Sequence, residues 1–237
     1  PVQEANDDHR VQFQNLIAEL TADEDRNHLI RDDVAQAVRD GRSPLVLTER
    51  TTHLELLAEY LKPLVRHVVV LRGGTGAKAT RESAKQLKSI PDSEDRVIVA
   101  TGRYVGEGFD DPRLDTLFVT LPVSWRGTVT QYVGRLHRLH EGKTEVRVYD
   151  YADLGVPMLA RMFDRRCDGY EAAGYAIHLP GSAVPGWPIE VPLPIDARWK
   201  SDYSTSVRRL IRDGVDAPLA RLFANATKEI DPSKEGS

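Results

Sequence analysis

Short apolar runs alternate with segments of helical periodicity through most of this chain. The runs expected to form strands are 45–47, 67–71, 96–100, 116–121 and 146–151. They are almost continuously apolar, which is typical of strands buried on both faces of a parallel sheet. The intervening segments show the 3.6-residue spacing of amphipathic helices. The pattern therefore predicts an α/β fold: an open parallel sheet with helices on both faces.

The expected helices occupy 54–61, after a cap at Thr51 or Thr52, and 78–88, 128–139 and 154–173. Segment 8–40 fits two short helices broken near 21–24. From Leu179 onward, repeated prolines exclude a helix interior or a central strand, so this part is expected to be extended. Apolar positions between Val207 and Phe223 then predict helical material at the end of the chain. We expect three parts: residues 1–40, 41–179 and 180–237.

Composition narrows the functional classes. The chain has 237 residues, 41% of them hydrophobic and 29% charged, which is typical of a soluble globular protein. Its net charge of -4 means that any site for a polyanion must be a local basic patch. Cys167 is the single cysteine and no zinc-ligand spacing occurs, so we expect no metal site in this chain. With no apolar leader, a cytoplasmic location and no membrane partner are expected.

A basic motif lies in the expected helix at 128–139. Gln131, Gly134, Arg135 and Arg138 are offset by three, four and seven residues and therefore share one helical face. Two guanidinium groups one turn apart suit the oxygens of a triphosphate. The alternative is an exposed basic face without a ligand. His137, within the same motif, is expected to be partly buried and bonded to a neighbour.

A glycine-rich segment follows the run 96–100. Thr101 and Gly102 offer a hydroxyl and unhindered amides to a phosphate, and Gly106 and Gly108 permit a tight return before Asp110. A purely structural turn is the alternative. The glycines at 73, 74 and 76 precede Lys78 but do not match the GxxxxGK[ST] rule for a phosphate-binding loop.

Taken in order, these segments resemble the C-terminal RecA-like domain of superfamily two DEAD/DEAH-type helicases, closest to bacterial restriction and repair types. Leu45 to Arg50 resembles motif IV, Thr101 to Asp110 resembles motif V, and Gln131 to Arg138 resembles motif VI. The resemblance covers about residues 26–150. Three motifs in the family's order are more specific than any one of them.

The resemblance implies residue roles. Arg135 and Arg138 are expected to be arginine fingers that reach the γ-phosphate of ATP, and are thus the catalytic residues. The other expected ATP-binding residues are Gly108, Asp110, Gln131 and Gly134. The nucleic-acid backbone is expected to contact Thr48, Arg50, Gly73, Gly74, Thr101, Gly102 and Arg103.

The chain lacks the P-loop lysine and the acidic box that hydrolysis in this family requires. We therefore expect residues 1–40 to be a connector from a first RecA-like domain of the same polypeptide, which would hold ATP and Mg²⁺. The chain alone is expected to hydrolyse no ATP and to bind neither ATP nor Mg²⁺ tightly. Its partners would be that first domain, single- or double-stranded nucleic acid, and a nuclease or methylase.

Two alternatives remain open. The chain could be a non-catalytic α/β module that binds nucleotide or nucleic acid. It could also be a metabolic enzyme for a nucleotide sugar or phosphosugar built on a similar sheet.

Overall fold

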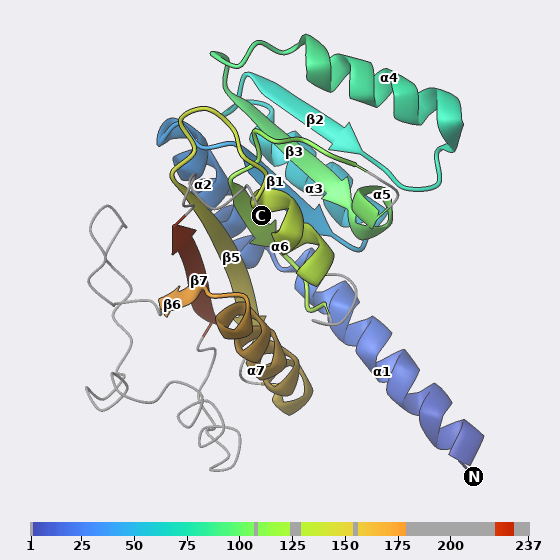
Figure 1. Cartoon of the computed structure of the whole chain (residues 1–237). Helices are drawn as coiled ribbons and strands as arrows, with labels where there is room; N and C mark the ends of the chain where they lie inside the picture. The colour runs from blue at the N-terminus through green and yellow to red at the C-terminus, as the bar shows by residue number, and fades with distance from the viewer. Residues whose placement is uncertain (1, 107–108, 124–128, 154–155, 179–220, 230–237) are drawn as a thin grey trace. The chain divides into compact units, whose positions relative to one another are not determined.

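The computed structural model describes residues 2–106, 109–123, 129–153, 156–178 and 221–229 (Figure 1). The chain divides into two compact units, residues 1–107 and 108–237, which are described separately. The expected Pro-rich segment from Leu179 lies outside the described residues up to position 220. No helix in the described ranges is long and apolar enough to cross a membrane.

Unit 1 is built on three parallel strands, β1 (Pro44–Thr48), β2 (His67–Leu71) and β3 (Arg96–Thr101). The strand β3 lies between the other two. All five residues of β1 and the first five of β3 are buried, as expected for strands covered on both faces. The predicted strands of this unit are confirmed.

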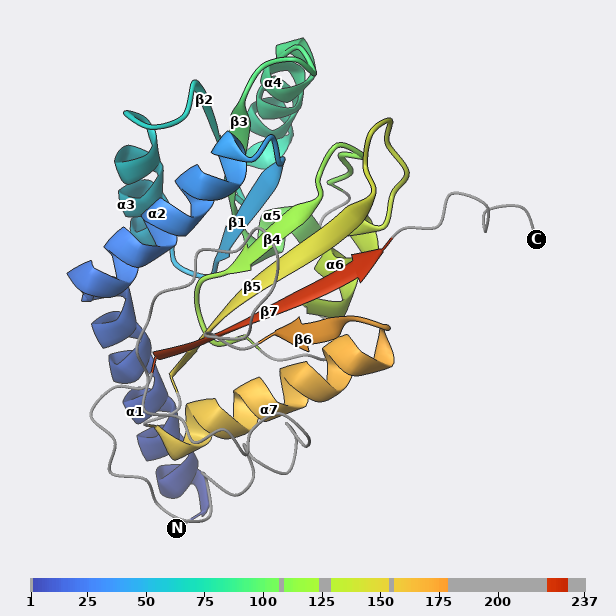
Figure 2. The same ribbon diagram turned by 90° about the vertical axis from the view of Figure 1, so that its left-hand side faces the viewer.

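Helices cover both faces of these strands. The helices are α1 (Val2–Ala22), α2 (Glu24–Arg39), α3 (Thr51–Leu61), α4 (Gly76–Ser89) and the short α5 (Gly102–Gly106). The connection through α3 runs from β1 to β2 at the opposite edge of the three strands, and the connection through α4 runs in the reverse direction, from β2 to β3. Because both connections are right-handed, α3 and α4 lie on opposite faces of the sheet. Figure 2 shows α2 and α3 on one side of the strands and α4 on the other.

The predicted break between the first two helices is confirmed at Asp23. This residue has an extended backbone, and its carboxylate accepts a hydrogen bond from the backbone N–H of Arg26 at 3.0 Å. Such an N-cap satisfies one of the amide groups that the first turn of α2 leaves unpaired.

Unit 2 contains the parallel pair β4 (Thr116–Val119) and β5 (Glu145–Asp153), connected through α6 (Thr130–Leu136). The helix α7 (Pro157–Ala172) follows and packs against β5. Its proline occupies the first helical turn, where a missing N–H costs nothing. The α/β fold class with parallel strands is confirmed.

Two antiparallel strands were not predicted. The strand β7 (Arg221–Glu229) pairs with β5 along its whole length, and β6 (Ala176–His178) pairs with β7. The expectation of helical material was wrong at Leu222 and Phe223, which lie in β7. The open edge of β5 offers a row of backbone hydrogen-bonding groups, and pairing with it outweighs the weak local preference of this segment.

Candidate functional site

The loops that follow the three strands of unit 1 meet at one edge of the sheet. Thr48 at the end of β1 is the register partner of Thr101 at the end of β3, and Leu71 at the end of β2 is the partner of Ala100. The backbone N–H of Gly73 donates to the Thr101 hydroxyl at 2.9 Å. Ligands of open α/β sheets bind at such carboxyl ends.

Gly73 and Gly74 pack directly beneath Arg103. A Cβ atom at Gly73 would lie 2.7 Å from the Cβ of Arg103 and 2.9 Å from the backbone nitrogen of Tyr104, so the position accepts only glycine without rearrangement. Gly74 has φ of +79°, and a Cβ there would lie 3.4 Å from Nη1 of Arg103. Arg103 is exposed, whereas Gly102 is buried at the start of α5. Four of the expected backbone-contacting residues, Gly73, Gly74, Thr101 and Arg103, are therefore in one cluster.

Thr48 is buried and lies outside the cluster formed by Gly73, Gly74, Thr101 and Arg103. Its side chain is 1% exposed and its hydroxyl lies 2.9 Å from Nδ1 of His53, while Nε2 of His53 lies 2.8 Å from Oδ1 of Asn27. The Asn27 amide donates to the Thr21 carbonyl at 2.9 Å, so its oxygen is the acceptor. His53 thus donates from Nε2, and its Nδ1 accepts the proton of Thr48.

Burial, followed by the positive charge of Arg26, lowers the pKa of His53 to about 4. The imidazole is therefore neutral at pH 7, which the tautomer above requires. The Thr48 hydroxyl also accepts a hydrogen bond from the backbone N–H of Arg50 at 3.4 Å. The side chain of Arg50 donates to Gln14 of α1. Two contacts therefore hold the loop after β1: the buried hydrogen bond between Thr48 and His53, and the hydrogen bond from Arg50 to Gln14 of α1.

In unit 2, Arg138 lies next to Asp110. The Nε atom of Arg138 is 3.4 Å from Oδ1 of Asp110, and the side chains are 61% and 46% exposed. The neighbouring Asp111 is buried and its carboxylate accepts a hydrogen bond from the backbone N–H of Arg113 at 3.2 Å. The structure therefore brings together one expected arginine finger and one expected nucleotide-binding carboxylate.

Arg135 lies in the last turn of α6, which ends at Leu136, so Arg138 is outside the helix and the expected helix at 128–139 was wrong at this end. The Nη1 atom of Arg135 is buried and has no hydrogen-bond partner among the described residues. A buried guanidinium nitrogen without an acceptor is uncommon, because desolvating a polar group without a partner is costly. Gly134 is exposed, and a Cβ added there would meet no heavy atom within 4 Å. Gln131 lies in α6, and Gly108 lies outside the described residues.

The expectation for His137 is confirmed. Its side chain is half-buried, and Nε2 is hydrogen-bonded to the Tyr175 hydroxyl at 2.8 Å. Burial raises the pKa of Tyr175, so the phenol stays protonated. Across the described ranges, no group of three or more His, Cys, Asp or Glu residues is arranged to hold a metal ion.

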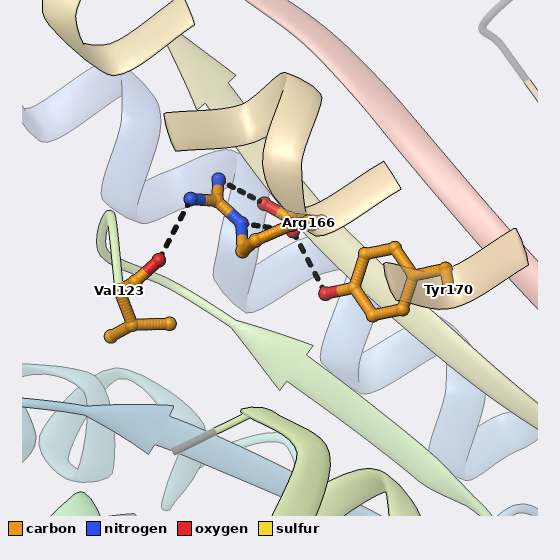
Figure 3. A network of polar contacts seen from close by, with 4 residues as sticks. Val123, Arg166 and Tyr170 are labelled. Carbon is orange, nitrogen blue, oxygen red and sulfur yellow. Dashed lines mark hydrogen bonds and ion pairs between the residues drawn. The ribbon is translucent and has the colours of Figure 1, made fainter. Parts of the chain in front are cut away.

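Sequence reasoning missed a buried network in unit 2 (Figure 3). Arg166 of α7 and Asp150 of β5 are each 1% exposed, and two hydrogen bonds of 2.6 and 2.8 Å join them. The Tyr170 hydroxyl donates to the same carboxylate at 2.9 Å, and Nη1 of Arg166 donates to the Val123 carbonyl at 3.0 Å. Burial alone would lower the pKa of the Arg166 guanidinium, but the negative charge and the hydrogen bonds of Asp150 have the larger combined effect, so the pKa is raised.

This network holds the Val123 carbonyl, at the end of the described segment that follows β4. Val123 follows β4 on the way to α6, the helix that bears Arg135. One signal was present in the sequence: Arg166 and Tyr170 are four residues apart, next to apolar positions that place them on the buried face of α7.

No protein-family model matches the chain. Over 121 residues, or 50% of the chain, it is 32% identical to the transcript termination protein A18 of cowpox virus (strain Brighton Red), of which the match covers 24%. The chain thus spans about a quarter of that relative's length.

Two solved structures show a weaker likeness. T4 UvsW aligns with 54% of this chain and 25% of its own, at 21% identity and a TM-score of 0.45. The C-terminal part of the Fun30 ATPase domain aligns with 77% of this chain and 52% of its own, at 12% identity and a TM-score of 0.44. Both TM-scores are below 0.5, so neither alignment supports an argument about function.

Proposed function

We propose that this chain supplies the second RecA-like domain of an ATP-dependent nucleic-acid helicase or translocase. The observation that carries the proposal is Arg135, whose buried Nη1 has no acceptor among the described residues. A phosphate oxygen supplied from outside the chain would provide the missing acceptor. In this role Arg135 offsets the negative charge that develops as the γ-phosphate is transferred.

Arg138 would act beside Arg135. Its ion pair with Asp110 has a single 3.4 Å contact between exposed side chains. Exposed pairs of this kind contribute only about 0–1 kcal/mol. A triphosphate carries more negative charge than one carboxylate, so it can recruit the guanidinium from Asp110. Asp110 then becomes available to the ribose, the role that the motif V resemblance implies, with Gly108, Gln131 and Gly134 lining the nucleotide.

The nucleic-acid backbone would lie over the cluster formed by Gly73, Gly74, Thr101 and Arg103. An exposed arginine above a glycine loop suits phosphate oxygens, because the absence of side chains lets a backbone approach closely. Gly102 contributes its amide at the start of α5. Thr48 would position Arg50 through the hydrogen bond to its backbone N–H rather than touch the strand with its buried hydroxyl.

The poxvirus similarity supports association with nucleic acid. That relative is named a transcript termination protein. The same hypothesis places ATP and Mg²⁺ on a first RecA-like domain of the same polypeptide, since the present sequence contains no P-loop lysine. It also includes residues 1–40 as the connector, a cytoplasmic location and a nuclease or methylase partner.

ATP turnover tests the proposal directly. We expect the 237-residue chain alone to hydrolyse no ATP above background. The complete polypeptide encoded by the gene is expected to hydrolyse ATP, and single-stranded nucleic acid is expected to stimulate it. Robust turnover by the 237-residue chain alone would overturn the assignment of the catalytic machinery to another domain. A complete polypeptide without turnover would overturn the helicase assignment.

A further inference from the structure

The helix α4 bears three exposed basic side chains on one face. Arg81, Lys85 and Lys88 are spaced by four and three residues and therefore form a single row, called here the basic stripe. Leu87, on a different face of the helix, is 7% exposed, and α4 packs against β2. The stripe thus lies on a helix held in place by its other side.

One acidic side chain, Glu82, lies beside the stripe, three residues before Lys85. Four other basic residues of unit 1 are paired with acids: Arg31 with Asp32, Lys62 with Glu59, Arg66 with Glu94 and Arg72 with Glu55. Within the described part of the chain, no ion pair joins any residue of the stripe to an acid. The sequence of α4 holds four basic residues and one acidic residue, a local charge of +3 in a chain of net charge -4.

Such an arrangement disfavours the helix itself. Like charges three or four residues apart destabilise an isolated helix, and Glu82, three residues before Lys85, offsets only part of the repulsion along the row. The repulsion is removed when a polyanion binds across the row. Seven residues of helix separate Arg81 from Lys88, a rise of about 10.5 Å. That length matches roughly three phosphates of one strand at about 3.4 Å each.

The position of α4 extends the proposed contact cluster. The helix begins at Gly76, two residues beyond Gly74, where the guanidinium of Arg103 lies. We propose that the basic stripe of Arg81, Lys85 and Lys88 is a second contact surface for the phosphodiester backbone, continuing the path that starts at the Gly73–Gly74 loop. This inference rests on the proposed function and specifies a surface that the sequence motifs do not include.

The test compares two triple variants of the 237-residue chain. In the stripe variant, R81Q/K85Q/K88Q, three charges are removed from α4. In the control, R31Q/R39Q/K62Q, three charges are removed from α2 and the end of α3, on the other face of the sheet. Circular dichroism and thermal unfolding establish that both variants fold. Binding is measured by fluorescence anisotropy with fluorescein-labelled dT30 and rU30 between 25 and about 200 mM salt.

We expect the stripe variant to bind more weakly and its plot of log K against log salt to become shallower by about 1.4–2.1, because each lost contact to a single strand changes the slope by about 0.7. The control is expected to keep the wild-type slope within about 0.5. Comparing dT30 with rU30 shows which polymer supplies the phosphates.

Four results would overturn the inference. A stripe variant with the wild-type slope would refute the stripe alone and leave the proposed function in place. Equal losses of oligonucleotide affinity in the two variants would show that the effect comes from net charge and not from the basic stripe. Binding of polyglutamate in competition with dT30 at equal charge would assign the stripe to an acidic protein. If the wild-type chain binds neither oligonucleotide, the nucleic-acid part of the proposed function fails as well.

Discussion

Thr48 and His53 are joined by a 2.9 Å hydrogen bond inside unit 1, with both side chains 1% exposed. The bond links the end of β1 to α3, and the second nitrogen of His53 extends the link to Asn27 of α2. A neutral imidazole is required, because one ring nitrogen must accept while the other donates. The geometry of the loop after β1 therefore depends on the protonation state of a buried histidine.

Stability is expected to fall in weak acid because of His53. Its pKa is about 4 in the folded chain and about 6.5 when unfolded, so between these values the unfolded chain binds the extra proton. The stabilisation is fully present above pH 6.5, decreases as the pH falls and is lost below 4. The difference between the two pKa values corresponds to about 3 kcal/mol of the free energy of unfolding. Urea unfolding at several pH values, compared with His53→Gln, measures this difference; an identical pH dependence in both proteins would contradict it.

Breaking the ion pair between Arg166 and Asp150 is expected to destabilise unit 2 strongly. The variant R166M leaves the buried Asp150 carboxylate with the Tyr170 hydroxyl as its remaining hydrogen-bond donor among the described side chains, and loss of one partner of a buried pair costs about 3–5 kcal/mol. The double variant D150L/R166M should cost less than R166M alone, because no charge stays buried. Urea unfolding measures both. A double variant no more stable than R166M would contradict this account.

Two glycine substitutions are expected to act in opposite directions. Gly73→Ala places a methyl group 2.7 Å from the Cβ of Arg103, and such overpacking costs about 1–3 kcal/mol. Gly134→Ala fills open space in α6 and should stabilise that helix by about 0.5–1 kcal/mol. Thermal unfolding of the two variants measures the contrast.

Gly134→Ala also separates stability from function. In the complete polypeptide it should lower ATP turnover despite the gain in stability, because the proposed nucleotide approaches this glycine. Unchanged turnover would place the nucleotide elsewhere. A Gly73→Ala variant as stable as the wild type would contradict the close packing beneath Arg103.

The strands were predictable where burial on both faces leaves a continuous apolar run, as at 45–47 and 97–100. The strand β7 was not, because its pairing with β5 is set by backbone groups of a segment about seventy residues earlier. The short α5 was read as a loop, since glycines at both of its ends carry no helical signal.

The candidate site likewise contains features that sequence spacing predicted and features that depend on tertiary contacts. Spacing predicted Arg135 and Arg138 on one helix, but only Arg135 lies in α6, because the helix ends at Leu136. The hydrogen bond between Gly73 and Thr101, and the pairing of Arg166 with Asp150, join different elements and depend on tertiary contacts. His53 was missed because a histidine on an apolar helix face gives no sign of whether it faces Thr48 and Asn27 or a hydrophobic core.

The central claim is that Arg135 completes a nucleotide site held by another domain. The most direct measurement is kcat for ATP in the complete polypeptide carrying Arg135→Ala, with Arg161→Ala as the control, an exposed arginine of α7 in the same unit. The account predicts that Arg135→Ala lowers kcat by about 10³-fold while Arg161→Ala leaves it unchanged. Wild-type turnover in the folded Arg135→Ala variant would contradict the account.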